Sequence, residues 1–424
     1  MKNKQAIYLL FLANIISGIA QGISMIAIPW YFVKLVSRPE VFANSYLLIT
    51  FLTLFWGLYA GTLVDRYSRK KLFVIINIVC GILIAGIAFY GTHISFLPDT
   101  LVLMVFGITI FNYNIHYPNL YAFGQEITEP RNYGKLNSYI EVQGQVTSVL
   151  AGAFAAILLT GTNNNSLDIG GFSFHLPFNI KPWKIYEIFL LDAATYVAVI
   201  FIFIFMRYVK IAKEKTNKEG LFDRFKAGFY YLKNHSTIFV FGLVSYMLFA
   251  FILVEIHVVL PSYVKNFLHM GGDVFASAEI YYSFGAIFSG LLILRLFKKF
   301  NTVIAVIILM IVVAFAFFLM FLYDILWVFF LGNFLLGITN AGVRILRTTY
   351  IFKHIPNNLI GRAGSVFSTL NIIVRMLLIG LFAMPFFQIE DNIRYAYLIG
   401  LFIMLISVII LLIWYKRITK IEEK

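Results

Sequence analysis

Charged residues are scarce in this chain of 424 residues. Asp, Glu, Lys and Arg make up 13% of the sequence, whereas hydrophobic residues make up 61% and aromatic residues 18%. A soluble domain carries about 25% charged residues, so this chain has too few to cover a surface that faces water. The composition therefore excludes an ordinary soluble protein and places the chain in a lipid bilayer.

Cysteine is nearly absent as well. The single cysteine, Cys80, excludes intrachain disulfides and metal sites of the CxxC type. The seven histidines form no HExxH pattern, and no Gly-x-x-x-x-Gly-Lys-Ser/Thr motif for nucleotide phosphates occurs. We therefore expect no metal site, no cofactor and no ATP-hydrolysing module within the chain.

Long apolar segments recur along the sequence. A transmembrane helix needs about 20 mostly apolar residues, and twelve segments reach this length. They lie near 6–33, 44–64, 72–91, 101–122, 139–160, 185–206, 237–263, 274–294, 302–322, 326–349, 364–387 and 394–415. The sequence predicts an all-α membrane protein with twelve transmembrane helices, and the even number places both termini on one side.

Acidic residues are outnumbered by basic ones, 20 to 34. With these spans, and with Arg394 at the edge of the last span counted on the opposite side, 25 Lys and Arg residues fall on the side of the termini, 6 on the opposite side and 3 inside helices, which accounts for all 34. Basic residues collect on the cytoplasmic side of membrane proteins. We therefore predict cytoplasmic termini in a bacterial cytoplasmic (inner) membrane, and we read the net charge of +14 as topology, not as nucleic-acid binding.

An internal repeat indicates that the chain is duplicated. The stretch from Gly61 to Lys71 recurs in weaker form from Gly290 to Lys299, with Leu294 where the first copy has Asp65. Pro130 and Gly134 are matched in the same way by Pro356 and Gly361. Near-equal offsets of this kind predict two pseudo-symmetric six-helix bundles, at residues 1–206 and 237–424.

The segment 207–236 between the bundles is expected to be a cytoplasmic linker. Within it, Phe222, Phe225, Phe229 and Leu232 are spaced as one apolar face among charged positions. This pattern predicts an amphipathic helix at the membrane surface. On the opposite side, the segment 161–184 is the sizeable loop, and Phe172 to His175 is predicted to form a short strand after the Gly170-Gly171 turn.

The stretch from Gly61 to Lys71 resembles motif A of the major facilitator superfamily, G-x-L-x-D-R-x-G-R-K, with Ser68 at the second glycine. Other matches resemble the branch of drug, macrolide and siderophore exporters, namely Ala27-Ile28-Pro29-Trp30, Pro118, Gly134-Lys135-Leu136-Asn137-Ser138 and Gly361-Arg362. The resemblance spans nearly the whole chain. It implies a proton-coupled transporter that works by alternating access, although Gln21 stands where members of that branch often carry an acid.

Motif A also has a physical role to fill. Asp65 ends the second helix, and the amino terminus of helix eleven, predicted near 361–364, offers unpaired amides and the positive end of a dipole. We predict that Gly61, Asp65, Arg66 and Arg69 form a conformational latch, and the resemblance implies that the latch stabilises the outward-facing state. A purely topological signal is the alternative, but it explains the cations and not Asp65 or Gly61.

Polar residues follow one face of three predicted helices. Helix one carries Asn14, Ser17, Gln21 and Ser24, helix four carries Asn112, His116 and Asn119, and helix ten carries Asn333, Asn340, Arg344 and Arg347. A polar stripe in lipid must face protein or a water-filled cavity. We predict a substrate cavity lined by Asn14, Gln21, Asn112, His116, Asn119, Asn340 and Arg344. Packing through interhelical hydrogen bonds, worth about 0.6 kcal/mol each, is the alternative.

Single charges lie deep in other helices. Arg375 is about halfway along helix eleven and costs at least about 2.5 kcal/mol there unless it has a partner. Glu255, Asp192 and Glu279 are the candidate partners. A carboxyl at such depth can exchange protons near neutral pH, so we name Glu255 first and Asp192 second as coupling residues, with Arg375 beside them. A structural ion pair is the alternative.

Together these features predict a secondary transporter with rocker-switch alternating access. We expect it to export a small amphipathic organic compound by proton antiport and to act as a monomer. A siderophore or metal-chelate exporter and a metabolite importer are the alternatives within transport. A membrane-embedded enzyme or sensor is the alternative outside it, but no paired nucleophile and base occur at one helix end, so we expect no enzymatic activity.

Overall fold

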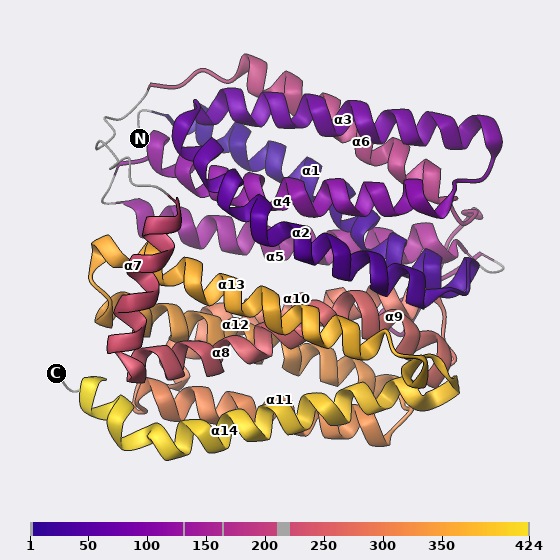
Figure 1. Ribbon diagram of the computed structural model, residues 1–424. Helices are drawn as coiled ribbons and strands as arrows, with labels where there is room; N and C mark the ends of the chain where they lie inside the picture. Colours follow the sequence, from indigo (N-terminus) through magenta and orange to yellow (C-terminus); the bar gives the residue numbers. More distant parts are fainter. Residues whose placement is uncertain (1–2, 130–131, 163–164, 210–220, 423–424) are drawn as a thin grey trace. The chain divides into compact units, whose positions relative to one another are not determined.

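The computed structural model describes residues 3–129, 132–162, 165–209 and 221–422. The first part of the chain is helical apart from one hairpin (Figure 1). Its helices are α1 (Lys4–Trp30), which continues into the π-helical turn η1 (Tyr31–Leu35), α2 (Pro39–Arg66), α3 (Arg69–Ile94), α4 (Asp99–Ile127), α5 (Tyr133–Thr160) and α6 (Ile185–Phe205). Strands β1 (Ser166–Ile169) and β2 (Phe172–His175) lie between α5 and α6.

The second part of the chain begins with α7 (Leu221–Asn234). The seventh membrane-spanning helix, called helix seven below and distinct from α7, follows in four consecutive pieces. These are α8 (Ser236–Val254), the π-helical turn η3 (Glu255–Val259), α9 (Leu260–Ser262) and the π-helical turn η4 (Tyr263–Phe267). The remaining elements are α10 (Gly272–Leu296), α11 (Thr302–Leu322), α12 (Leu326–His354), α13 (Asn357–Phe382), the short turns η5 (Pro385–Gln388) and η6 (Glu390–Arg394), and α14 (Tyr395–Glu422).

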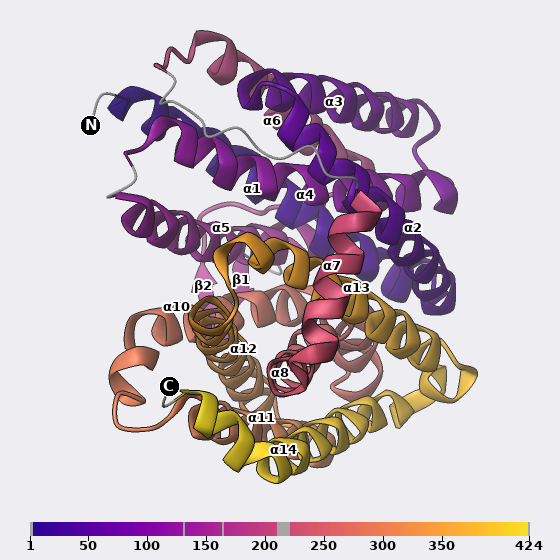
Figure 2. The same cartoon turned by 60° about the vertical axis from the view of Figure 1, so that its left-hand side comes forward.

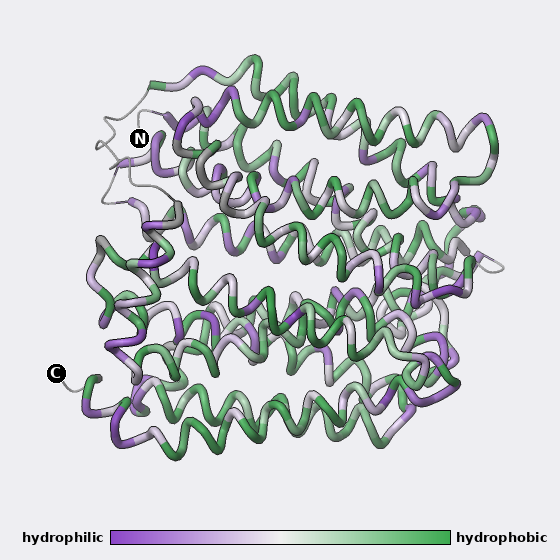
Figure 3. The backbone as a smooth tube through the Cα atoms, viewed as in Figure 1, coloured by the Kyte–Doolittle hydropathy of each residue, from purple (hydrophilic) through white to green (hydrophobic). Residues whose placement is uncertain are grey.

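Within the described residues, twelve helices are long and apolar enough to cross a membrane, which confirms the predicted number. In Figure 3 the hydrophobic colour follows these helices, and hydrophilic residues gather toward their ends. The eleventh membrane-spanning helix is α13, and it begins earlier than predicted. It starts directly after Pro356, which interrupts helical hydrogen bonding. Gly361 and Arg362 therefore lie inside the first turns of α13 and do not open it.

The predicted strand from Phe172 to His175 is confirmed. It pairs antiparallel with β1, and Ile169 lies opposite Phe172. Figure 2 labels both strands. Gly170 and Gly171 have φ angles of 63° and 80°. Positive φ at both central residues fits a type I′ hairpin turn, which glycine adopts without steric cost.

The chain divides into two compact units. Unit 1 contains Met1–Arg38, Phe51–Thr216 and Gly271–Ile280, and unit 2 contains Pro39–Thr50, Asn217–Met270 and Tyr281–Lys424. Each unit therefore includes the first part of one helix from the other half of the sequence. In unit 1 the ring of Phe275 from α10 stacks on Trp30 at 5.4 Å, and in unit 2 the ring of Tyr46 from α2 lies 5.4 Å from His257.

The ends of α1 and helix seven repeat the same backbone device. A π-helical turn begins at Tyr31 in one and at Tyr263 in the other. Each turn is followed by a residue with positive φ, which is Ser37 at 53° and His269 at 54°. A shared departure from regular helix at matching places supports the internal duplication.

A pair of glycines sets the distance between α1 and α5. A Cβ atom on Gly18 would lie 2.8 Å from Thr147 Cγ2, and one on Gly22 would lie 2.7 Å from Ala151 Cβ. This G-x-x-x-G spacing lets the two helices approach closely, which is how membrane helices associate without a hydrophobic driving force. The contact brings the polar face of α1 toward α5.

The linker helix α7 packs against α13 and α8. Gly228 makes the approach possible, because a Cβ atom there would lie 2.3 Å from the Arg362 carbonyl oxygen. Tyr231 Oη donates to the His354 carbonyl over 3.2 Å, and burial raises the pKa of this hydroxyl, which keeps the donor proton in place. Leu232 is buried, Phe225 is half-buried and Phe229 is 48% exposed, so the rest of the protein covers only part of the predicted apolar face. The side chain of Phe222 lies outside the described part.

Candidate functional site

A chain of hydrogen bonds joins α1, α4 and α5 in unit 1. Asn14 donates to Gln143, and Gln143 Nε2 donates to Thr147 Oγ1 over 2.9 Å. His116 Nε2 lies 2.8 Å from Asn14 Oδ1, and because that oxygen can only accept, the histidine nitrogen donates. Asn14 and His116, both predicted for the cavity, are thus in contact. Gln143 was missed because the polar residues of α5 lie on more than one face of the helix.

A second group of polar side chains lies on α1, α4 and α6. Gln21 donates to Ser17. Asn112 Nδ2 lies 3.4 Å from both Gln21 Oε1 and Tyr196 Oη. Gln21 and Asn112 are 2% and 4% exposed, and Asn112 Oδ1 has no hydrogen-bond partner among the described residues. These two predicted residues therefore form a buried site that can still accept a hydrogen bond.

Asn119, the third polar residue of α4, does not join either group. It is fully buried, and its Nδ2 donates to the backbone carbonyl of Arg69 over 3.0 Å. Its amide therefore fixes the start of α3 from within the protein. The helical spacing could not separate it from Asn112 and His116, because the partner on α3 is distant in sequence.

Asp192 is the deeply buried acid of unit 1. It is 0% exposed, and its Oδ2 lies 3.3 Å from the donating hydroxyl of Ser24 on α1. Its Oδ1 has no hydrogen-bond partner, and no cation forms an ion pair with it within the residues that the structure describes. A carboxyl in this environment can take up a proton without losing a cationic partner.

The residues of motif A are described in part. The environment of Gly61 and the side chains of Asp65 and of Leu294 in the second copy lie outside what the structure describes. Arg66 ends α2 and is exposed, whereas Arg69 is 3% exposed. The latch therefore remains a prediction.

A further residue of motif A has a role that the sequence did not reveal. Lys70 Nζ donates to the carbonyl oxygens of Ile204 and Met206 over 3.3 Å and 2.9 Å. These carbonyls lie at the end of α6, where a cation is favoured by the helix dipole. Lys70, the second residue of α3, thus ties the start of α3 to the end of α6.

In unit 2 the buried acid is Glu255, the first residue of η3. It is 1% exposed and accepts a hydrogen bond from Tyr397 Oη on α14 over 2.8 Å. His257 contacts a different group, since its Nδ1 lies 3.0 Å from the Leu253 carbonyl oxygen. Glu255 and His257 therefore point to different partners, as their spacing of two residues predicts.

The polar stripe of α12 combines different roles. Arg347 is 4% exposed, its Nη1 donates to the Ser245 carbonyl over 2.9 Å, and its guanidinium lies 3.6 Å from the centroid of Tyr246. Asn340 Nδ2 donates to Tyr282 Oη on α10 over 2.5 Å. Arg344 is only half-buried. Arg347 is thus fixed by packing, whereas Arg344 keeps part of its side chain accessible.

Arg375 lacks the acidic partner that its depth predicted. Within the described residues no carboxylate forms an ion pair with it, and its buried Nε has no hydrogen-bond partner. Asp192 and Glu279 belong to unit 1. In unit 2 the predicted pairing with Glu255 was wrong, because spacing along a helix fixes depth but not the direction of a neighbouring carboxylate. Pairing with Asp192 or Glu279 stays a prediction.

An apolar groove lies between α1 and α5 in unit 1. It encloses about 500 Å³ and is lined by Lys4, Ile7, Tyr8, Phe11, Ile15, Tyr139, Val142, Gln143 and Val146. Gln143 belongs to the hydrogen-bonded chain described above, and Lys4 supplies a positive charge at the start of α1. Apolar walls with a few polar groups are typical of sites for small organic ligands.

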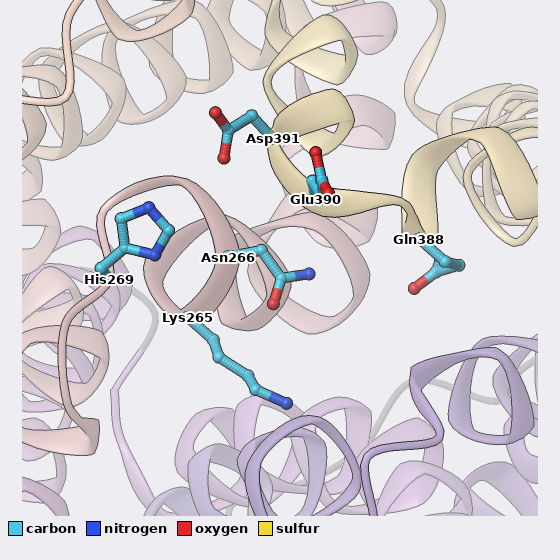
Figure 4. Close-up of a pocket in the computed structure, with 6 residues that line it drawn as sticks. All are labelled: Lys265, Asn266, His269, Gln388, Glu390 and Asp391. Carbon is cyan, nitrogen blue, oxygen red and sulfur yellow. The ribbon is translucent and has the colours of Figure 1, made fainter.

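A polar crevice of about 440 Å³ lies in unit 2, beside η4 and η6 (Figure 4). Its lining residues are Lys265, Asn266, His269, Gln388, Glu390 and Asp391. In the close-up, the carboxylates of Glu390 and Asp391 point away from Lys265. No group of three or more metal-ligating side chains is found in the described part of the chain, so this crevice is not a metal site of that kind.

Comparisons with known proteins agree with this architecture. Residues 10–378 match the family model of the Major Facilitator Superfamily. No curated protein sequence matches the chain.

Solved structures of three transporters resemble the chain over almost its whole length. The nucleoside transporter NupG has 14% identity over 97% of this chain and 99% of its own, with a TM-score of 0.67. A bacterial homologue of the iron transporter ferroportin, in its inward-facing state, has 14% identity over 97% and 98%, with a TM-score of 0.70. The D-xylose-proton symporter has 12% identity over 96% and 97%, with a TM-score of 0.65. At these identities the likeness concerns the fold alone.

Proposed function

The chain belongs to the major facilitator superfamily and is a secondary transporter of the membrane, and we propose that it exports a small amphipathic organic compound in exchange for protons. Rocker-switch movement of two bundles around a central site is the mechanism that this architecture supports. The two units, each with its own buried acid, provide the parts that such a movement requires.

The environment of Asp192 is the single observation that carries the proposal of proton coupling. The carboxyl is fully buried, accepts one hydrogen bond from Ser24, and has a second oxygen without a partner among the described residues. Such an acid is costly to keep ionised and gains from binding a proton. We place Asp192 before Glu255 as the coupling residue, because each acid accepts one hydrogen bond but only Asp192 has a buried oxygen without a partner among the described residues. This reverses the order that the sequence predicted.

The groove between α1 and α5 supports an amphipathic substrate. Its walls are largely aliphatic and aromatic, while Gln143 connects it to Asn14 and His116. A compound with an apolar body and one polar end would bury the body in the groove and direct the polar end toward these side chains. Asn14, Gln21, Asn112 and His116 are then the proposed cavity residues of unit 1, with Asn340 and Arg344 their proposed counterparts in unit 2.

The proposed direction is export, and it rests on the resemblance of Ala27 to Trp30 and of Gly134 to Ser138 to the exporter branch. We place the protein in a bacterial cytoplasmic membrane as a monomer with cytoplasmic termini, since basic residues predominate on the side of the termini. A metabolite importer and a siderophore exporter make the same use of Asp192, so the transport assay must distinguish them.

The test uses purified protein in liposomes and a panel of amphipathic compounds, siderophores and sugars. Proton movement driven by a compound gradient should occur in the wild type and disappear in Asp192→Asn, while binding of the same compound persists. Asp99→Asn is the matched control, because Asp99 is an acid that pairs with the exposed Arg38 over 3.2 Å. Proton movement retained in Asp192→Asn would overturn the coupling role.

Direction is measured separately, in right-side-out and inside-out vesicles from the same cells. A proton gradient directed into the cell should drive the compound out of right-side-out vesicles and into inside-out ones. The opposite pattern would refute export and identify an importer.

A further inference from the structure

Arg375 is a deep charge that the proposed proton chemistry does not use. Its Nε is buried without a hydrogen-bond partner, and no described carboxylate forms an ion pair with it. The residue as a whole is only half-buried, so part of its side chain reaches open space. An arginine in a membrane-spanning helix is costly unless it faces protein or water, so this open space needs an explanation.

The exposed part of Arg375 does not face lipid. Ile373 and Leu377, one turn apart on α13, are 43% and 69% exposed and mark the apolar outer face of this helix. Arg375 is two residues from each of them, which is a rotation of about 200° around an α-helix. Its side chain therefore leaves the helix on the face opposite to the apolar one.

The described residues of unit 2 that interact with Arg375 on that face carry no negative charge. α13 packs against α8 and η3, and Arg375 interacts electrostatically with His257 of η3 and with Tyr46 of α2, both in unit 2. Histidine and protonated tyrosine carry no negative charge that could balance a guanidinium. The buried acid of the unit, Glu255, accepts a hydrogen bond from Tyr397 on α14.

Two further arginines add to the positive charge of unit 2. Arg347 is fixed by the Ser245 carbonyl and the ring of Tyr246, and Arg344 interacts electrostatically with Arg347. The interiors of α12 and α13 thus hold three arginines, whereas the interior of helix seven supplies one acid. A low-dielectric interior with an excess of one charge attracts ligands of the opposite sign.

We propose that Arg375 binds an anionic group of the transported compound, so that the substrate is an amphipathic organic anion such as a monocarboxylate or a sulfonate. A guanidinium offers paired donors that match the two oxygens of such a group. The inference deepens the proposed function and rests on it. It explains why a deep arginine has been left without a protein partner, since a permanent acid there would compete with the substrate.

The experiment compares an aromatic carboxylate with its uncharged amide, 2-naphthoate with 2-naphthamide, by titration calorimetry on the purified full-length protein. The wild type should bind the carboxylate at least about tenfold more tightly than the amide, as expected for a hydrogen bond to a charged group. Arg375→Gln should raise the Kd of the carboxylate by about 10- to 100-fold and leave the amide unaffected. Arg375→Lys should keep part of the preference, and Arg417→Gln, which removes an exposed arginine of the same unit, should keep all of it.

Several results would overturn the proposal. The first is equal binding of carboxylate and amide by the wild type, and the second is an unchanged preference in Arg375→Gln. The third is displacement of the carboxylate by chloride but not by gluconate at equal concentration, which would identify an inorganic anion as the ligand. The comparison of carboxylate and amide binding by the wild type tests the proposal even if Arg375→Gln does not fold. Proton movement driven by an uncharged or cationic compound, and lost in Asp192→Asn, would refute the anionic substrate while upholding the proposed function.

Discussion

Ser24 on α1 donates a hydrogen bond to Asp192 on α6 over 3.3 Å, although 168 positions separate them in the sequence. Unit 2 contains a related pair, in which Tyr397 on α14 donates to Glu255 of helix seven over 2.8 Å. In unit 1 the first helix supplies the hydroxyl and the sixth the acid, whereas in unit 2 helix seven supplies the acid and the last helix the hydroxyl. The duplicated architecture thus keeps the contact and exchanges its chemical groups.

Replacement of Ser24 by alanine should destabilise the protein. It removes the hydrogen bond that Asp192 accepts, and an unsatisfied buried polar group costs about 1–3 kcal/mol. We expect a lower melting temperature in detergent at pH 8, where the carboxyl is most readily ionised. Ser24→Thr keeps the hydroxyl and should retain most of the stability. Equal melting temperatures for wild type and Ser24→Ala would show that this contact is not used.

Replacement by glutamine should have different effects at Arg347 and at Arg344. Arg347→Gln removes a buried cation–π contact, worth about 2 kcal/mol when desolvated, and should lower membrane expression and thermal stability. Arg344→Gln should leave expression intact and raise the apparent dissociation constant of the substrate. The measurements are quantitative immunoblots and substrate titration. Loss of folding in Arg344→Gln would make the whole stripe of α12 structural.

A larger side chain on α1 alone should disrupt the close contact between α1 and α5. Gly22→Leu places atoms where Ala151 already lies, and overpacking typically costs about 1–3 kcal/mol. If α1 and α5 move apart, the hydrogen bond between Asn14 and Gln143 should be lost. Transport should then fall together with thermal stability. Gly22→Ala combined with Ala151→Gly exchanges the methyl group between the helices and should recover stability relative to Gly22→Ala alone. A failure of this exchange to recover stability would indicate that Gly22 acts through α1 itself.

Docking of α7 should depend on Gly228. A leucine there would collide with the Arg362 carbonyl, so α7 should leave α13 and expose the linker to protease. The measurement is the rate of limited proteolysis in membranes, which should rise in Gly228→Leu. Lys226→Leu changes an exposed position of the same helix and should keep the wild-type rate. Equal rates for the two variants would contradict the docking.

Asp65 should matter more than Leu294, its counterpart in the repeat. We expect Asp65→Asn to impair transport and to shift the labelling of cysteines placed in the cavity toward inward-facing states, because the predicted latch would lose its carboxylate. Leu294→Asn should leave both transport and labelling close to wild type. Full transport and unchanged labelling in Asp65→Asn would remove the latch from the mechanism.

The sequence by itself determined the twelve spans, the duplication and the polar faces of α1, α4 and α12. It could do so because bilayer thickness sets helix length and the helical period decides which side chains share a face. For this reason Asn14, Gln21, Asn112 and His116 could be named before any contact was known. The same reasoning grouped Asn119 with them, since periodicity does not say which helix a face meets.

Only the tertiary structure decided the partners. It paired Ser24 with Asp192 and Tyr397 with Glu255, fixed Arg347 on Tyr246, and left Arg375 without an acid among the described residues. It also assigned the starts of α2 and α10 to the units formed mainly by the other halves of the chain. These relationships depend on the rotation and approach of helices that lie far apart in sequence, and close packing at residues such as Gly18 and Gly22 sets that approach.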